Sequence, residues 1–95
     1  MVRIGVLAST KASDLQAVLD AIRSNVLNAV VSVVISNKED AFALERARKH
    51  GVAGVFVDPR DFSDITDKDA KREAYDKAVA HELDQRNVDL VLMIG

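Results

Sequence analysis

The sequence of 95 residues has no cysteine and no tryptophan, and only one proline. Without cysteine, disulfides, thiolate metal sites and a cysteine nucleophile are excluded. No apolar run approaches the length of a membrane span, and the first residues lead into an apolar segment unlike a signal peptide. A net charge of −2 gives no general attraction to nucleic acid or anionic membranes. We therefore expect a cytoplasmic protein.

Aliphatic side chains supply most of the apolar content. Hydrophobic residues make up 48% of the sequence, whereas aromatic residues make up only 4%. A core of Val, Leu, Ile and Ala is typical of a parallel sheet covered by helices. The length allows one small domain, or part of a larger one.

Short β-branched runs alternate with segments of helical periodicity. The expected strands are residues 4–8, 30–35, 52–57 and 88–94. The first expected helix begins at residue 13 or 14, and the second and third span residues 41–50 and 71–86. Gly51 and Asn87 mark the ends of the last two helices, and residues 63–69 are expected to form a loop. With right-handed crossovers, this order predicts an α/β fold: an open, parallel, four-stranded sheet with helices on both faces, Rossmann-like in type.

The segment that joins the first strand to the first helix is polar and rich in small residues. Ser13 and Gln16 have the spacing of a capping box, which places the helix start at Ser13 or Asp14. A loop that leads into a helix N-terminus presents free backbone N–H groups at the positive end of the helix dipole. This arrangement suits an anion, most often a phosphate.

The last apolar run, residues 88–94, closes the sequence. We expect it to lie beside the first strand, so that the ligand-binding switch point falls between the ends of these two strands. One wall of this crevice would be the segment from Thr10 to Asp14, and the other would follow Gly95. Two readings stay open. The chain is one half of an enzyme that needs a carboxyl-terminal half, or it is a non-catalytic half-domain that self-associates as a homodimer through its fourth strand.

Four blocks of this sequence resemble phosphoribosylglycinamide formyltransferase of purine biosynthesis, in the order in which that family carries them. They are residues 6–17 (VLASTKASDLQA), 34–47 (VISNKEDAFALERA), 72–76 (REAYD) and 88–95 (VDLVLMIG). The second block is fairly specific, whereas the first alone would be weak. The resemblance covers nearly the whole chain but only the amino-terminal half of the family, so residues 1–95 are expected to be one incomplete, substrate-phosphate domain.

The resemblance implies transfer of a formyl group from 10-formyltetrahydrofolate to the amino group of glycinamide ribonucleotide, without a metal. The catalytic Asn, His and Asp of the family fall after Gly95, so no catalytic residue is expected in this chain, and the chain alone is expected to be inactive. Arg72 matches an arginine that the family uses near the folate. The family loop that holds the substrate phosphate corresponds here to Thr10, Lys11, Ala12, Ser13 and Asp14.

This loop departs from the family pattern Gly-Asn-Gly-Ser-Asn, of which only Ser13 is retained. Thr10 and Ala12 add side chains where the family has glycine, and Asp14 places a carboxylate near a dianion. Lys11 could offset that charge. The competing interpretation of the loop is an ordinary capped turn, and that of Arg72 is a solvated residue paired with Asp69 or Asp76.

Other polar residues favour structural roles. His50 falls at the end of the second helix, where positive charge is favourable, and Arg46 is expected on that helix's solvent face. His81 has no second ligand at i+4, and the acidic stretch from Asp61 to Asp69 lacks EF-hand spacing. A phosphoacceptor receiver domain shares the strand order but needs acidic residues after the first strand, which are missing.

Overall fold

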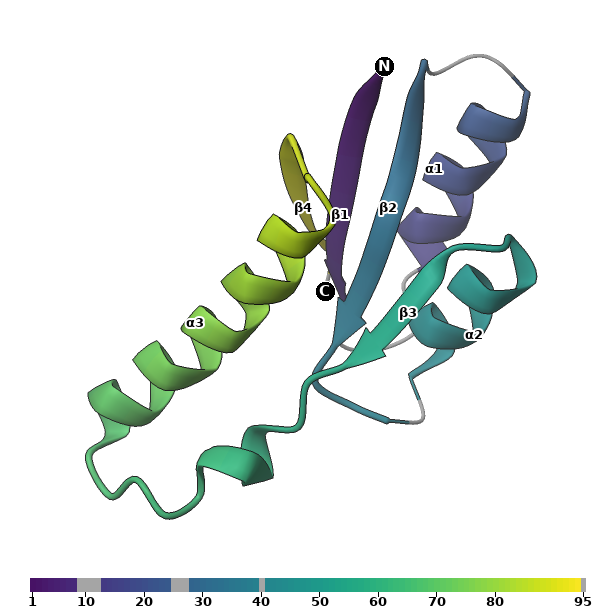
Figure 1. Cartoon of the computed structure of the whole chain (residues 1–95). Coiled ribbons are helices and arrows are strands. Elements are labelled where there is room, and N and C mark those ends of the chain that lie inside the picture. Colours follow the sequence, from purple (N-terminus) through teal and green to yellow (C-terminus); the bar gives the residue numbers. More distant parts are fainter. Residues whose placement is uncertain (9–12, 25–27, 40, 95) are drawn as a thin grey trace.

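A computed structural model describes residues 1–8, 13–24, 28–39 and 41–94. In chain order the strands are β1 (Val2–Ala8), β2 (Ala29–Ser36), β3 (Ala53–Phe56) and β4 (Leu90–Ile94). The helices are α1 (Ser13–Arg23), α2 (Phe42–Lys49), the short 3₁₀ helix η1 (Pro59–Phe62) and α3 (Lys68–Gln85). Figure 1 shows a central sheet, with α1 and α2 on one side and the long α3 on the other.

The four strands form one parallel sheet in the order β3-β2-β1-β4. The prediction that the fourth strand lies beside the first is therefore confirmed. The β1–β2 register shifts between Ile4 and Gly5, which pair with Val31 and Val33 respectively. Ser32, the one polar residue inside the otherwise apolar run of β2, falls at this irregularity, where the ladder has one extra residue.

The two faces of the sheet are covered by separate clusters of apolar side chains. On one face, Leu15 and Leu19 of α1 and Leu44 of α2 pack with alternate residues of β1 and β2. On the other face, Val79 of α3 packs with Val33 and Ile35 of β2. Because successive residues of a strand point to opposite faces, a strand buried on both faces must be apolar throughout, and β2 nearly is.

Left-handed residues follow the last two α-helices. Gly51, just after α2, has φ 70°, and Asn87, just after α3, has φ 55°. Glycine adopts this conformation without strain, and asparagine tolerates it better than most residues. The predicted stops at these two positions are confirmed.

The predicted start of α3 was wrong, since the helix begins at Lys68 rather than Lys71. Asp67 is its N-cap, and the Asp67 side chain accepts a hydrogen bond from the backbone N–H of Asp69 at 3.2 Å. Apolar side chains larger than alanine start only at Tyr75 in this helix, because its first turns face solvent. The cap, rather than the stripe, determines where the helix begins.

Close packing at Gly5 brings the end of α3 onto the sheet. A Cβ at Gly5 would lie 2.6 Å from Leu83 Cδ2 and 3.1 Å from Val88 Cγ1. Only glycine fits here without a shift of these neighbours. β4 is an edge strand, and it exposes apolar side chains, with Met93 82% exposed and Leu90 49% exposed.

Candidate functional site

The topological switch point of the sheet lies at β1, where successive strands change from one side of β1 to the other. The chain proceeds from β1 to β2 to β3 on one side and returns through α3 to place β4 on the other. The carboxyl ends of β1 and β4 are adjacent, with Ala8 opposite Ile94. In open parallel sheets, ligands bind outside this kind of switch point, because the connections there lead away on opposite faces and leave a crevice.

The predicted phosphate residues follow β1 directly. Thr10, Lys11 and Ala12 lie outside the described residues. Ser13 and Asp14 form the start of α1, as the capping-box spacing predicted, but their side chains are not described. The backbone therefore places the amino end of an α-helix beside the switch point, and phosphate binding by these five residues stays a prediction.

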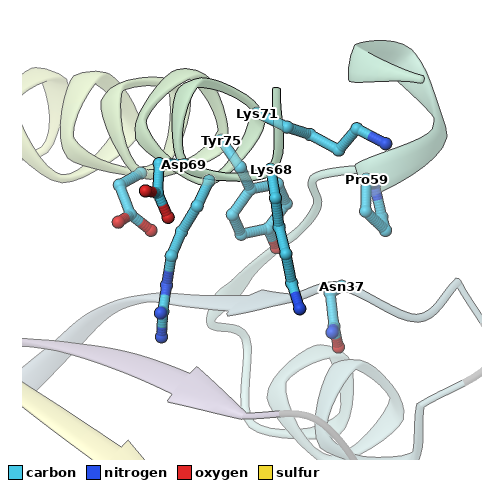
Figure 2. A pocket seen from close by; sticks show the side chains of 8 residues that line it. Asn37, Pro59, Lys68, Asp69, Lys71 and Tyr75 are labelled. Carbon is cyan, nitrogen blue, oxygen red and sulfur yellow. The ribbon is translucent and has the colours of Figure 1, made fainter. Parts of the chain in front are cut away.

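A cavity of about 500 Å³ lies beside the carboxyl end of β2, between the turn after this strand and the amino half of α3. Its lining residues are Asn37, Pro59, Lys68, Asp69, Lys71, Arg72, Tyr75 and Asp76. Figure 2 shows Lys68 extending from α3 toward Asn37, while Lys71 extends toward Pro59. The predicted folate-proximal residue, Arg72, is thus one of several polar groups around a common space.

Cations outnumber anions around this cavity. Lys68, Lys71 and Arg72 face two carboxylates, Asp69 and Asp76. Within the part of the chain that the structure describes, none of the three cations forms an ion pair or a side-chain hydrogen bond. The alternative pairing of Arg72 with Asp69 or Asp76 is therefore not observed. Three cations without such partners favour a ligand with an anionic group.

Tyr75 forms the apolar wall of the cavity. Partial burial raises the pKa of the Tyr75 hydroxyl, and the nearby Asp76 carboxylate adds to this shift. Its ring meets Phe62 edge-to-face, with centroids 6.0 Å apart and planes at 83°. This contact holds η1 against α3 and fixes one side of the cavity.

The turn after β2 places Asn37 at the cavity. Ser36 is only 1% exposed, and its hydroxyl oxygen accepts a hydrogen bond from the backbone N–H of Lys38 at 3.1 Å. A local bond of this kind stabilises a tight turn, so Asn37 is presented at the carboxyl edge of the sheet.

The Asp58 carboxylate organises the turn after β3. It accepts hydrogen bonds from the Arg60 backbone N–H at 2.9 Å and from Arg60 Nε at 3.0 Å, and it lies 2.9 Å from Arg60 Nη2. These bonds with Arg60 hold the pKa of Asp58 below its usual value. A capped and charged turn thereby fixes Pro59, which lines the cavity.

Sequence reasoning named Arg72 but missed Lys68, Asn37 and Tyr75 as its neighbours. Lys68 was placed in a loop, because the helix was expected to start three residues later. Asn37 carried a usable signal, since it follows a buried strand at the carboxyl edge of the sheet, where ligand-binding residues gather. Tyr75 was named only within the block of residues 72–76 that carries the family resemblance.

The described residues contain no group of three or more His, Asp or Glu side chains arranged to hold a metal ion. None of the helices in these ranges is long and apolar enough to cross a membrane.

Comparison with known proteins identifies the class to which this fold and switch point belong. Residues 2–95 match the sequence model of the formyl transferase family, and the chain belongs to that family. The prediction of a formyltransferase resemblance is confirmed, as is the predicted open parallel sheet with helices on both faces.

Individual relatives of known sequence or structure point to a narrower group within this family. The chain is 41% identical over 92 residues to phosphoribosylglycinamide formyltransferase of Escherichia coli, covering 97% of this chain and 40% of that protein. It is 36% identical to a trifunctional purine biosynthetic protein of Chironomus tentans, of which it covers 6%. The crystal structure of glycinamide ribonucleotide transformylase 1 from Symbiobacterium toebii superposes with a TM-score of 0.86 at 41% identity, covering 100% of this chain and 42% of that one. The chain thus spans well under half the length of these relatives.

Proposed function

We propose that this chain is the substrate-phosphate part of a phosphoribosylglycinamide formyltransferase. The complete enzyme would transfer the formyl group of 10-formyltetrahydrofolate to the amino group of glycinamide ribonucleotide. The observation that carries the proposal is that the amino end of α1 follows β1 beside the switch point, in a chain whose relatives bear this activity in their names. The helix N-terminus suits the phosphate of the ribonucleotide, because its free N–H groups and dipole favour an anion.

The cavity at Arg72 would receive part of the folate donor. A folate carries carboxylates, and Lys68, Lys71 and Arg72 provide cations that fit such a group. The Tyr75 ring offers an apolar surface beside them. In this proposal the chain binds and orients both substrates, whereas the groups that transfer protons and stabilise the reacting centre come from the carboxyl-terminal part of the family.

Reconstitution tests this proposal. The chain alone is expected to show no formyl transfer, and mixing it with the carboxyl-terminal part of the Escherichia coli relative is expected to restore measurable activity. In the reconstituted protein, glycinamide ribonucleotide should shift the backbone amide resonances of Lys11 to Asp14. If neither this ribonucleotide nor ribose 5-phosphate moves these resonances, phosphate binding by the loop is refuted.

A second candidate function, a non-catalytic domain that self-associates through β4, is favoured by one observation. β4 is an edge strand on which Leu90, Val91 and Met93 are exposed. Two copies could pair their β4 strands antiparallel across a two-fold axis. Sedimentation at high micromolar concentration distinguishes the candidates, since a monomer would refute self-association, and a dimer lost on Val91→Lys would support it.

A further inference from the structure

The side chain of Gln16 connects the first turn of α1 to the end of α2. Its carbonyl oxygen accepts a hydrogen bond from Arg46 Nη1 at 2.9 Å. Its amide nitrogen donates to Asp20 Oδ1 at 3.0 Å and lies 3.2 Å from His50 Nε2. Gln16, Arg46 and His50 are all half-buried. The sequence predicted Arg46 on the solvent face of its helix, but the structure places it in this partly buried contact.

The chemistry of the neighbours fixes the orientation of the Gln16 amide. An arginine guanidinium can only donate, so the carbonyl oxygen must face Arg46. An ionised carboxylate can only accept, so the amide nitrogen must face Asp20. The same nitrogen faces His50 Nε2, and two donors cannot bond to each other. His50 Nε2 is therefore the acceptor in this contact, which for a neutral ring corresponds to the tautomer with the proton on Nδ1.

We propose that Gln16 is a positioning residue, which holds the first turn of α1 in place by bonding simultaneously to Arg46 and His50 of the α2 end. Gln16 lies 30 positions from Arg46 and 34 positions from His50 in the sequence, so these contacts are tertiary rather than local. The apolar contacts of α1 lie on its inner side, at Leu15 and Leu19. Apolar packing is not directional, whereas the two polar contacts of this amide with Arg46 and His50 specify rotation and position along the helix axis.

The position of this turn bears on ligand binding, and here the inference rests on the proposed function. Residues 13–15 carry N–H groups that have no partner within the helix. These N–H groups stabilise a bound anion only when it lies at the correct distance and angle for hydrogen bonding. A helix that can slide or rotate would present these donors less often in the productive arrangement, and the affinity for the substrate phosphate would fall.

Nitrogen-15 spectra of the histidine rings test the bonds directly, without any ligand. In the unmodified chain, His50 is expected as the Nδ1–H tautomer, and in Gln16→Leu this preference is expected to disappear. In Gln16→Glu an oxygen faces the ring instead, so Nε2 is expected to carry a proton. Gln85→Leu, at an exposed position on α3, is the matched control and should leave the His50 signals unchanged. A Nε2–H tautomer in the unmodified chain would overturn the proposal.

Two further measurements test positioning itself. Amide hydrogen exchange at residues 17–20 of α1, whose N–H groups bond to the carbonyl groups of the first turn, is expected to accelerate about tenfold in Gln16→Leu, as for the loss of roughly 1.4 kcal/mol of local stability, and to stay unchanged in Gln85→Leu. The dissociation constant for glycinamide ribonucleotide, measured in the reconstituted protein, is expected to rise by a similar factor. Unchanged exchange in Gln16→Leu would refute positioning, whatever the ligand does. If the unmodified protein binds no ribonucleotide while the tautomer and exchange results hold, the proposed function fails and the positioning role stands.

Discussion

At the scale of single residues, Gly5 is the position where one added carbon has the clearest cost. Gly5→Ala would place a Cβ 2.6 Å from Leu83 Cδ2 and between the two methyl groups of Val88, at 3.1 and 3.2 Å. The end of Leu83 can rotate away, but Val88 is β-branched and restricted. We expect Gly5→Ala to lower the free energy of unfolding by about 1–3 kcal/mol in urea titrations.

The matched control for this substitution is Gly54→Ala in β3. Its Cβ would meet Leu44 Cδ2 at 3.4 Å, which is ordinary van der Waals contact. The free energy of unfolding should therefore change by less than about 0.5 kcal/mol. Equal losses at Gly5 and Gly54 would contradict crowding against Leu83 and Val88 as the cause.

Asp58 gives a pH-dependent prediction. Its hydrogen bonds with Arg60 lower its pKa in the folded chain from the ordinary 3.8. The stabilisation from a lowered pKa is present above the unfolded value and disappears as the pH falls through the folded value. Asp58→Asn is therefore expected to be slightly less stable than the unmodified chain at pH 7, and the difference should shrink as the pH falls below 3.8 and through the lower folded pKa. Urea titrations across this pH range check this, and a difference independent of pH would contradict it.

At the scale of elements, the N-cap of α3 gives a second stability prediction. Asp67→Ala removes the acceptor for the Asp69 backbone N–H and is expected to lower the free energy of unfolding by about 1 kcal/mol. Asp64→Ala removes a carboxylate of the same segment that is exposed and makes no such bond, so it should change this free energy by less than about 0.5 kcal/mol. Thermal and urea unfolding of the two variants compare them directly, and similar losses would argue against capping.

The sequence predicted the elements well where one physical signal dominates. Residues 31–35, all buried except the half-buried Ser32, fit only a strand covered on both faces, and left-handed stops at Gly51 and Asn87 follow from backbone sterics. The start of α3 was missed because a solvent-exposed turn carries no apolar periodicity. The cavity around Arg72 was missed for a different reason, since it depends on where α3 lies relative to the turn after β2. The spacing of residues along the sequence does not indicate how far α3 lies from that turn.

The contacts of Gln16 show the same limit. The spacing of Ser13 and Gln16 suggested a capping box, which would turn the Gln16 side chain back toward its own helix start. The structure instead directs this amide to Asp20, Arg46 and His50. Two of these partners become neighbours only when α1 and α2 pack on the same face of the sheet, so no local pattern could indicate them.

At the scale of the whole molecule, the order of the strands predicts the order of local stability. β1 and β2 have a hydrogen-bonded strand on each side, whereas β3 and β4 have one on a single side. Amide hydrogen exchange should therefore be slowest in β1 and β2, faster in β3 and β4, and fast in the solvent-facing first turns of α3. Equal protection of β4 and β1 in dilute solution would contradict this order and would indicate that the outer edge of β4 is covered.

The pairing of β1 with β4 also has a consequence for how the chain is made. The backbone N–H of Arg3 bonds to the Asp89 side chain and its carbonyl oxygen to the Asp89 backbone N–H, across 86 positions of sequence. On a ribosome, β1 emerges early and can join β2 soon afterwards, but its second neighbour arrives only after α3 has been synthesised. Until α3 and residue 89 have been synthesised, one edge of β1 is therefore unpaired and open to wrong partners, and a nascent chain that stalls before residue 89 would be a natural client for chaperones.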